Sequence, residues 1–111
     1  MENLLVETIS YLEKYNKSLD DIYWIGGKDY LISKEEFIQK ADQLYSSGFG
    51  GVEVRPDLIL VGKDFWIERH SYDGSEWWEF KTLPTPPIII RKINNIIDWK
   101  DEDLENGIEI Y

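Results

Sequence analysis

The side chains best suited to chemistry or binding lie close together in the segment WIERHSYDGSEWWEFK, residues 66–81. The segment holds three of the five tryptophans, the only histidine, and a mixture of acidic and basic residues. Successive side chains of a β-strand point to opposite faces of the sheet, so a strand pair here would gather half of these groups on one face. The segment therefore predicts either a working surface or a hairpin whose buried face is aromatic.

A turn signal at Asp73-Gly74 sets the pairing within this segment. Asp-Gly favours a two-residue type I′ turn, in which Tyr72 faces Ser75. The pairs that follow along the predicted hairpin are His70–Trp77, Glu68–Glu79 and Trp66–Lys81.

A second turn is predicted at Gly62-Lys63, which suits a type II′ turn. It pairs Leu60 with Phe65, Leu58 with Ile67, and Asp57 with Glu68. Both turns divide the side chains into the same two faces. The predicted core face holds Leu58, Leu60, Phe65, Ile67, Trp78 and Phe80, and the second face holds Asp57, Ile59, Val61, Trp66, Glu68, His70, Trp77, Glu79 and Lys81.

The second face contains a like-charge pair, because Glu68 lies opposite Glu79 in the predicted register. Such a pair destabilises a hairpin unless a cation lies between the carboxylates. The simplest interpretation is structural: His70 and Lys81 neutralise the pair, and the tryptophans pack beneath the N-terminal helix or the C-terminal tail. Three functional interpretations stand beside it.

The first functional interpretation is metal-dependent hydrolysis, since carboxylates that converge on one face supply oxygen ligands for Mg²⁺. Pro56-Asp57, Glu68 and Glu79-Phe80-Lys81 resemble the PD-(D/E)xK nuclease pattern. The resemblance implies that Asp57, Glu68 and Glu79 bind the metal and that Lys81 is the catalytic residue that polarises the attacking water.

The second interpretation is capture of a small ligand. Aromatic side chains stack on a nucleotide-type ring, and neighbouring cations bind its polar edge. The candidates for this role are Trp66, Trp77, His70 and Arg69.

The third interpretation is a protein interface, and it accounts best for the residue types. Tryptophan, tyrosine and arginine dominate binding hot spots, and surrounding acids steer a basic partner toward them. The predicted binding residues are Trp66, Glu68, His70, Tyr72, Trp77, Glu79, Asp101, Glu102 and Asp103.

Composition narrows the class of protein. The net charge is −10, and a polyanion repels phosphate backbones, so direct nucleic-acid binding is disfavoured. The chain has no cysteine, which excludes a disulfide framework and a thiolate zinc site and fits a reducing compartment. It has no signal-peptide pattern and no apolar run long enough to cross a bilayer. We expect a single cytoplasmic domain over residues 1–111, without membrane association or cofactor; the oligomeric state stays open.

Periodicity predicts an α+β fold, with an antiparallel β-meander of three to four strands, an N-terminal helix and a second helix packed on the sheet. Leu5, Ile9, Leu12, Tyr15 and Leu19 form an amphipathic stripe within residues 3–19. Residues 21–32 predict two short strands around Gly-Gly. Ser33 and Glu36 form a capping box for a helix over 34–45 that buries Phe37, Ile38, Ala41, Leu44 and Tyr45 and ends near Gly48. The meander spans about 52–83, and residues 88–106 suit either a strand or a helix.

The run ERHSYDGSEWWEFKTLP resembles segments of small accessory proteins encoded by phages and prophages of low-GC Gram-positive bacteria. The resemblance covers about a fifth of the chain. It implies an inhibitor of a host defence protein, and it transfers no catalytic motif. Together with the charge, it predicts a non-enzymatic protein that binds and inhibits a basic host protein, such as one that handles nucleic acid.

Overall fold

The structure is a computed structural model that describes residues 1–46 and 50–102, and it confirms the predicted α+β class. Five antiparallel strands form the main sheet in the order β3-β2-β5-β6-β7. This exceeds the predicted three to four strands, because the short strands around Gly-Gly join the same sheet. The strands of the main sheet are β2 (Trp24–Gly26), β3 (Leu31–Ile32), β5 (Ile59–Val61), β6 (Phe65–Tyr72) and β7 (Ser75–Thr82).

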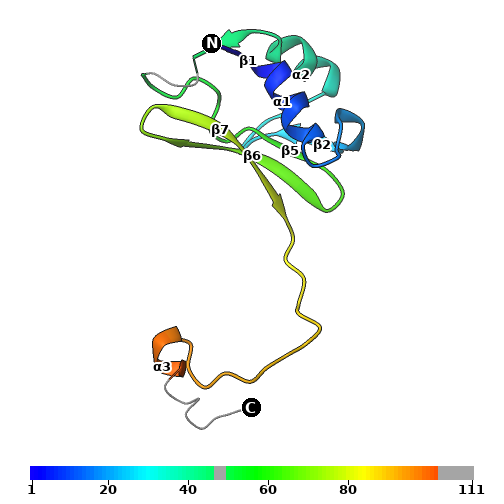
Figure 1. The fold of residues 1–111 in the computed structure, drawn as a ribbon. Coiled ribbons are helices and arrows are strands. Elements are labelled where there is room, and N and C mark those ends of the chain that lie inside the picture. The colour runs from blue at the N-terminus through cyan, green and yellow to red at the C-terminus, as the bar shows by residue number, and fades with distance from the viewer. Residues whose placement is uncertain (47–49, 103–111) are drawn as a thin grey trace.

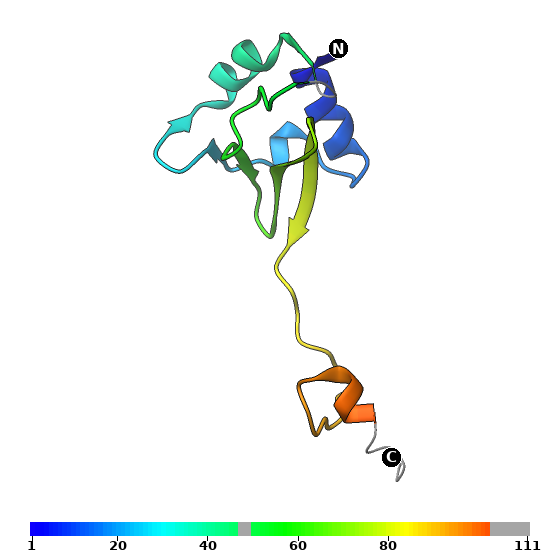
Figure 2. The same cartoon turned by 90° about the vertical axis from the view of Figure 1, so that its left-hand side faces the viewer.

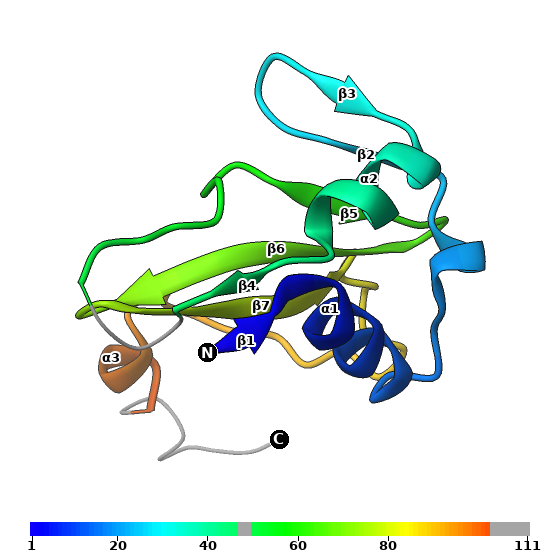
Figure 3. The same cartoon turned by 90° about the horizontal axis from the view of Figure 1, so that it is seen from above.

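Two helices, α1 (Leu4–Glu13) and α2 (Lys34–Ala41), lie on the same side of the main sheet. Figure 1 shows them above the strands, and Figure 3 looks down on them with β6 and β7 behind. A small second sheet pairs β1 (Glu2–Asn3) with β4 (Leu44–Tyr45) beside the helices. The helices therefore cover one sheet face, and among the described residues no helix covers the other.

Helix α1 buries a different stripe from the predicted one. Leu4, Thr8 and Leu12 are its buried residues, whereas Ile9 is exposed. The threonine is tolerated in the core because its hydroxyl is satisfied twice: Oγ1 donates to Leu4 O at 2.7 Å and accepts from Trp78 Nε1 at 3.1 Å. Of the predicted stripe, Leu12 is confirmed as buried and Leu5 and Leu19 pack against the core, whereas Ile9 and Tyr15 are exposed. The prediction missed Thr8 because it counted apolar residues alone.

Helix α2 begins as predicted and ends four residues early. Ser33 Oγ accepts from the Glu36 amide at 3.0 Å, which is the expected N-terminal cap. The helix stops at Ala41 because the next residues pair with β1 as strand β4. Leu44, predicted to be buried, is therefore 62% exposed, and Ile38 is also exposed, whereas the burial of Tyr45 is confirmed. The predicted stop at Gly48 lies outside the described residues.

The β6–β7 hairpin has the predicted register throughout. Asp73 and Gly74 have φ values of 53° and 86°, as a type I′ turn requires. Glu68 pairs with Glu79, His70 with Trp77, and Trp66 with Lys81.

The predicted β5–β6 register is wrong, because the turn lies one residue further along the chain than predicted. Gly62 N donates to Phe65 O at 2.8 Å, so the turn is centred on Lys63-Asp64. Ile59, not Asp57, faces Glu68, and Leu60 faces Ile67. Moving a turn by one residue shifts each cross-strand pair by two positions, which keeps every side chain on its predicted face. The predicted core face is accordingly confirmed, with Leu58, Leu60, Phe65, Ile67 and Trp78 buried and Phe80 packed against them.

One buried ion pair ties the layers of the fold together. Arg69 Nη2 lies 3.0 Å from Glu76 Oε1, and both side chains are almost inaccessible. Glu76 also accepts from the amides of Glu53 and Val54, and Arg69 donates to Tyr45 Oη at 3.1 Å. The pair thus joins the hairpin to the segment before β5 and to strand β4.

The chain leaves the sheet after Thr82 and extends away from it. Residues 83–97 form neither helix nor strand, and α3 (Asp98–Glu102) follows at the far end of this arm (Figure 2). The part of residues 88–106 that the structure describes is therefore irregular chain and one short helix. Over residues 1–46 and 50–102, no helix combines the length and the apolar character that a membrane crossing needs.

We predict that Arg69→Ala lowers the free energy of unfolding by about 3–5 kcal/mol, because it leaves the Glu76 carboxylate buried without its partner. This loss is a large share of the total stability, since the free energy of unfolding of a small domain is about 5–15 kcal/mol. Urea unfolding followed by circular dichroism measures the change, with the exposed Arg55→Ala as the matched control. The double variant Arg69→Met/Glu76→Gln should be more stable than Arg69→Ala, because it removes both buried charges and keeps a side-chain oxygen that accepts from a backbone amide. Equal loss in the single variant and in the control would contradict the role given to the pair.

Candidate functional site

The sheet face opposite the helices carries the candidate site. Its central row is formed by Glu68 on β6 and Glu79 on β7, which face each other. Tryptophans lie on both sides of this row, and Trp24 on β2 extends the aromatic surface through Val61, which lies between it and Trp66. Trp24 is 45% exposed, while Trp66 and Trp77 are half-buried. We call this set, Trp24, Trp66, Glu68, His70, Trp77, Glu79 and Lys81, the tryptophan face.

Two copies of one short pattern build the tryptophan face. Strand β6 presents Trp66, Glu68 and His70, and strand β7 presents Trp77, Glu79 and Lys81. Along each strand, every second residue therefore follows the order tryptophan, glutamate, basic residue. Because the strands are antiparallel, the two patterns run in opposite directions and meet at the glutamates, so each tryptophan faces the base of the other strand.

The hydrogen bonds follow the same pattern. Trp66 Nε1 donates to Glu68 Oε1 at 2.6 Å, and Trp77 Nε1 donates to Glu79 Oε2 at 3.1 Å. An indole N–H has no acceptor capacity, so each tryptophan is oriented by the glutamate two residues later. The rings are thereby fixed beside the carboxylates rather than free to turn.

Basic side chains offset the repulsion between the two carboxylates. His70 Nε2 lies 2.6 Å from Glu68 Oε2 and 3.5 Å from Glu79 Oε1, so the imidazole bridges the pair. Lys81 Nζ lies 3.3 Å from Glu79 Oε1. The Lys81 contact offsets one of the two negative charges, as the structural interpretation of this row predicted, and His70 adds a hydrogen bond to Glu68. The other half of that interpretation, coverage of the tryptophans by a helix or the tail, is absent over the described residues.

Both glutamates are held in their ionised form. The hydrogen bond from Trp66 is the main cause that lowers the pKa of Glu68 below its usual value, and His70 adds to it. The hydrogen bond from Trp77, followed by that from Lys81, lowers the pKa of Glu79. The face therefore presents two fixed negative charges framed by indole rings, an arrangement suited to a cation that carries apolar surface.

Asp57 does not join this row. Its Oδ2 accepts from the Lys28 amide at 3.0 Å and its Oδ1 from Tyr30 Oη at 3.1 Å, so it is bound to the β2–β3 turn. These contacts lower its pKa, the backbone hydrogen bond most of all. In the sheet order, that turn and the glutamates lie on opposite sides of β5. Within residues 1–46 and 50–102, no group of three or more His, Asp or Glu side chains is placed to hold a metal ion.

The remaining predicted residues are spread over the molecule. Tyr72 lies at the hairpin tip and is 78% exposed. Asp101 and Glu102 belong to α3, on the extended arm, and Asp103 lies outside the described residues. Arg69, a candidate for binding a ligand, points into the core instead. Alternation already implied this, because Arg69 lies between two residues of the second face.

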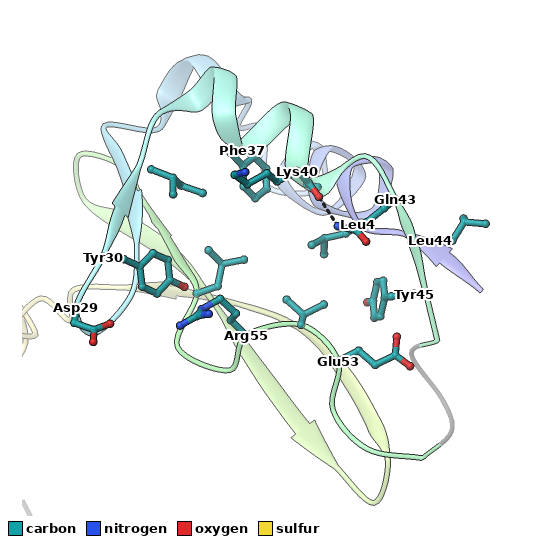
Figure 4. A pocket seen from close by; sticks show the side chains of 14 residues that line it. Leu4, Asp29, Tyr30, Phe37, Lys40, Gln43, Leu44, Tyr45, Glu53 and Arg55 are labelled. Atoms are coloured by element: carbon teal, nitrogen blue, oxygen red, sulfur yellow. Dashed lines mark hydrogen bonds between the residues drawn. The ribbon is translucent and has the colours of Figure 1, made fainter.

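A groove lies on the helix side of the sheet (Figure 4). It measures about 500 Å³, within the range of small-molecule sites. Tyr30 and Arg55 lie on one side of it, Phe37 above and Tyr45 on the other side. Sequence reasoning missed this groove because its walls come from α2, β3, β4 and the segment before β5, which no single pattern connects. The other lining residues are Leu4, Asp29, Ile32, Lys40, Ala41, Gln43, Leu44, Glu53, Val54 and Leu58.

No protein-family model matches the chain, and no curated protein or solved structure matches it either. The assignment of a function therefore depends on the geometry of the tryptophan face.

The lowered pKa values of Glu68 and Glu79 predict a pH-dependent stability difference. A carboxylate with a lowered folded-state pKa stabilises the fold above its ordinary value of 4.5, and this stabilisation disappears as the pH falls through the lowered pKa. Glu68→Gln and Glu79→Gln should each be less stable than the wild type near neutral pH and should approach it in acid. Urea unfolding at several pH values from neutral to strongly acidic tests this.

Glu35→Gln, an exposed position on α2, controls for the loss of one negative charge. A stability difference for Glu68→Gln and Glu79→Gln that stays constant down to strongly acidic pH would contradict the ionised network.

Proposed function

We propose that the protein is a non-enzymatic binding protein that captures a basic segment of another protein on the tryptophan face. The observation that carries this proposal is the half-buried Glu68–Glu79 pair framed by Trp66 and Trp77, on a sheet face that no helix covers over the described residues. In this proposal a lysine or arginine of the partner lies over the carboxylates, and its alkyl stem packs against the indole rings.

The chemistry of the tryptophan face supports a basic partner. Carboxylates whose pKa is lowered remain acceptors at neutral pH, and each carboxylate has about four lone-pair positions, of which the chain uses only part. Tryptophan rings attract cations through their faces and supply apolar contact area. The net charge of −10 adds a long-range field that speeds the approach of a positively charged surface.

The rigidity of the tryptophan face supports binding over a purely solvated surface. Both indoles are already oriented by hydrogen bonds to Glu68 and Glu79, so little side-chain entropy is lost when a partner docks. A pre-ordered aromatic pair in the centre of a patch is the usual arrangement of a hot spot. The residues that would carry binding are Trp66, Trp77, Glu68 and Glu79, with His70 and Lys81 holding the carboxylates in place.

The resemblance to phage and prophage accessory proteins suggests where the partner comes from. We propose that the partner is a host protein with a basic surface, such as one that handles nucleic acid, and that binding inhibits it in the host cytoplasm. Carboxylates then occupy the positions that such a surface offers to phosphates. The proposal assigns no cofactor, and it assigns no direct contact with nucleic acid.

We expect the immobilised protein to retain a basic protein from a host lysate at low salt and to release it as the salt concentration rises. Trp77→Ala should weaken this capture by about 30-fold, which corresponds to about 2 kcal/mol for a hot-spot tryptophan. Glu68→Gln and Glu79→Gln should reduce the salt dependence, because they remove the charges that steer the partner.

Trp99→Ala is the matched control, since Trp99 is 66% exposed and lies in α3, away from the tryptophan face. Capture that is lost equally in Trp99→Ala and Trp77→Ala, or that ignores both salt and Trp77, would contradict the proposal. Circular dichroism of each variant verifies that the fold is retained.

A further inference from the structure

An unusual exposed segment lies on the arm that leaves the sheet. Residues 88–97, IIIRKINNII, contain six isoleucines, and Ile88, Ile89 and Ile90 are 97%, 90% and 78% exposed. Isolated exposed apolar residues are ordinary, but a contiguous run of this kind marks an interaction segment. The arm stands clear of the sheet in Figure 2.

The charge of this segment is opposite to that of the rest of the chain. Residues 83–97 carry Arg91 and Lys92 and no acid, whereas residues 1–82 carry nine lysines and arginines against sixteen acids. An apolar segment with two adjacent cations has the composition that the tryptophan face is suited to bind. The same chain therefore carries both an acidic aromatic surface and a basic apolar segment.

The spacer between the two features keeps the segment away from its own sheet. Residues 83–87, LPTPP, contain three prolines, which favour an extended polyproline conformation of about 3.1 Å per residue. Such a spacer is semi-rigid, and it places Ile88 about 15 Å beyond the last residues of β7. The high exposure of Ile88–Ile90 agrees with this geometry, since contact with the chain's own face would bury them.

We propose that segment 88–97 of one molecule docks on the tryptophan face of a second copy, and that the exchange is reciprocal. The isoleucines pack against Trp66 and Trp77, and Lys92 lies over the Glu68–Glu79 pair. A reciprocal exchange has two-fold symmetry and uses both complementary surfaces of each molecule at once. This inference depends on the proposed function of the tryptophan face, and it adds that self-association competes with the basic partner for that face.

Self-association is tested first by analytical ultracentrifugation of the full chain over a range of concentrations. The wild type should pass from its monomer mass of 13.2 kDa to twice that mass as the concentration rises. Ile89→Glu/Lys92→Glu should remain monomeric, because it removes one apolar contact and reverses one charge on a segment that the fold does not bury. Trp77→Ala should also remain monomeric.

Val6→Glu is the matched control, since Val6 is 61% exposed and lies on α1, on the covered side of the sheet. It should associate like the wild type. A wild type that is monomeric at every concentration, or a dimer that persists in both Ile89→Glu/Lys92→Glu and Trp77→Ala, overturns the inference.

The position of the contact is tested by nuclear magnetic resonance on mixed samples. The chain has no cysteine, so Ile93→Cys offers a single attachment point for a spin label. The spin-labelled variant, prepared without ¹⁵N, is mixed with ¹⁵N-labelled wild type. It should broaden the wild-type amide signals of β6 and β7 and the indole signals of Trp66 and Trp77. Broadening confined to α1 and α2, or none at all, overturns the inference. Trp77-dependent capture of a host protein by a strictly monomeric chain would overturn this inference while leaving the proposed function intact.

Discussion

The buried pair between Arg69 and Glu76 is the interaction that fixes the hairpin against the segment before β5 and strand β4. Taking two charges out of water is expensive, so the pair persists only because each partner has further hydrogen bonds. Those bonds reach the segment before β5 and strand β4, and the Arg69 guanidinium also lies over the Trp78 ring at 4.8 Å. A hairpin fixed in this way on its inner side is a rigid support for the side chains of its outer face.

Because side chains alternate along a strand, the hairpin has an inner face against the helices and an outer face that differs from it in residue type. Ile67, Arg69, Trp78 and Glu76 face the helices, and the residues between them form the tryptophan face. On the inner face a cation and an anion neutralise each other beneath the helices, whereas on the outer face two anions are held side by side. Lys81 lies beside Glu79 and reduces the repulsion between those anions, and His70 contacts Glu68. The fold thus holds a like-charge pair on the outer face, and our proposal is that a cation of a partner protein binds there.

Local signals in the sequence predicted the centre of the fold well and its edges poorly. The Asp73-Gly74 turn determined the hairpin register, and through it every residue of the tryptophan face except Trp24, because a two-residue turn leaves no freedom in the pairing. The same register placed Arg69 and Glu76 on the inner face, although their pairing went unrecognised. The end of α2, the position of Asp57 and the groove depend on contacts between distant segments, such as the pairing of β1 with β4. No local pattern contains that information.

The central claim is that the tryptophan face is open to solvent while the core beneath it is closed, and the five tryptophans test it in one experiment. A soluble paramagnetic agent broadens the indole N–H signals of a ¹⁵N-labelled monomeric sample in proportion to their accessibility. We expect strong broadening for Trp24 and Trp99, which are 45% and 66% exposed, clear broadening for Trp66 and Trp77, and none for Trp78, which is 2% exposed. Protection of Trp66 and Trp77 equal to that of Trp78 would contradict the account, because some part of the chain would then cover the face.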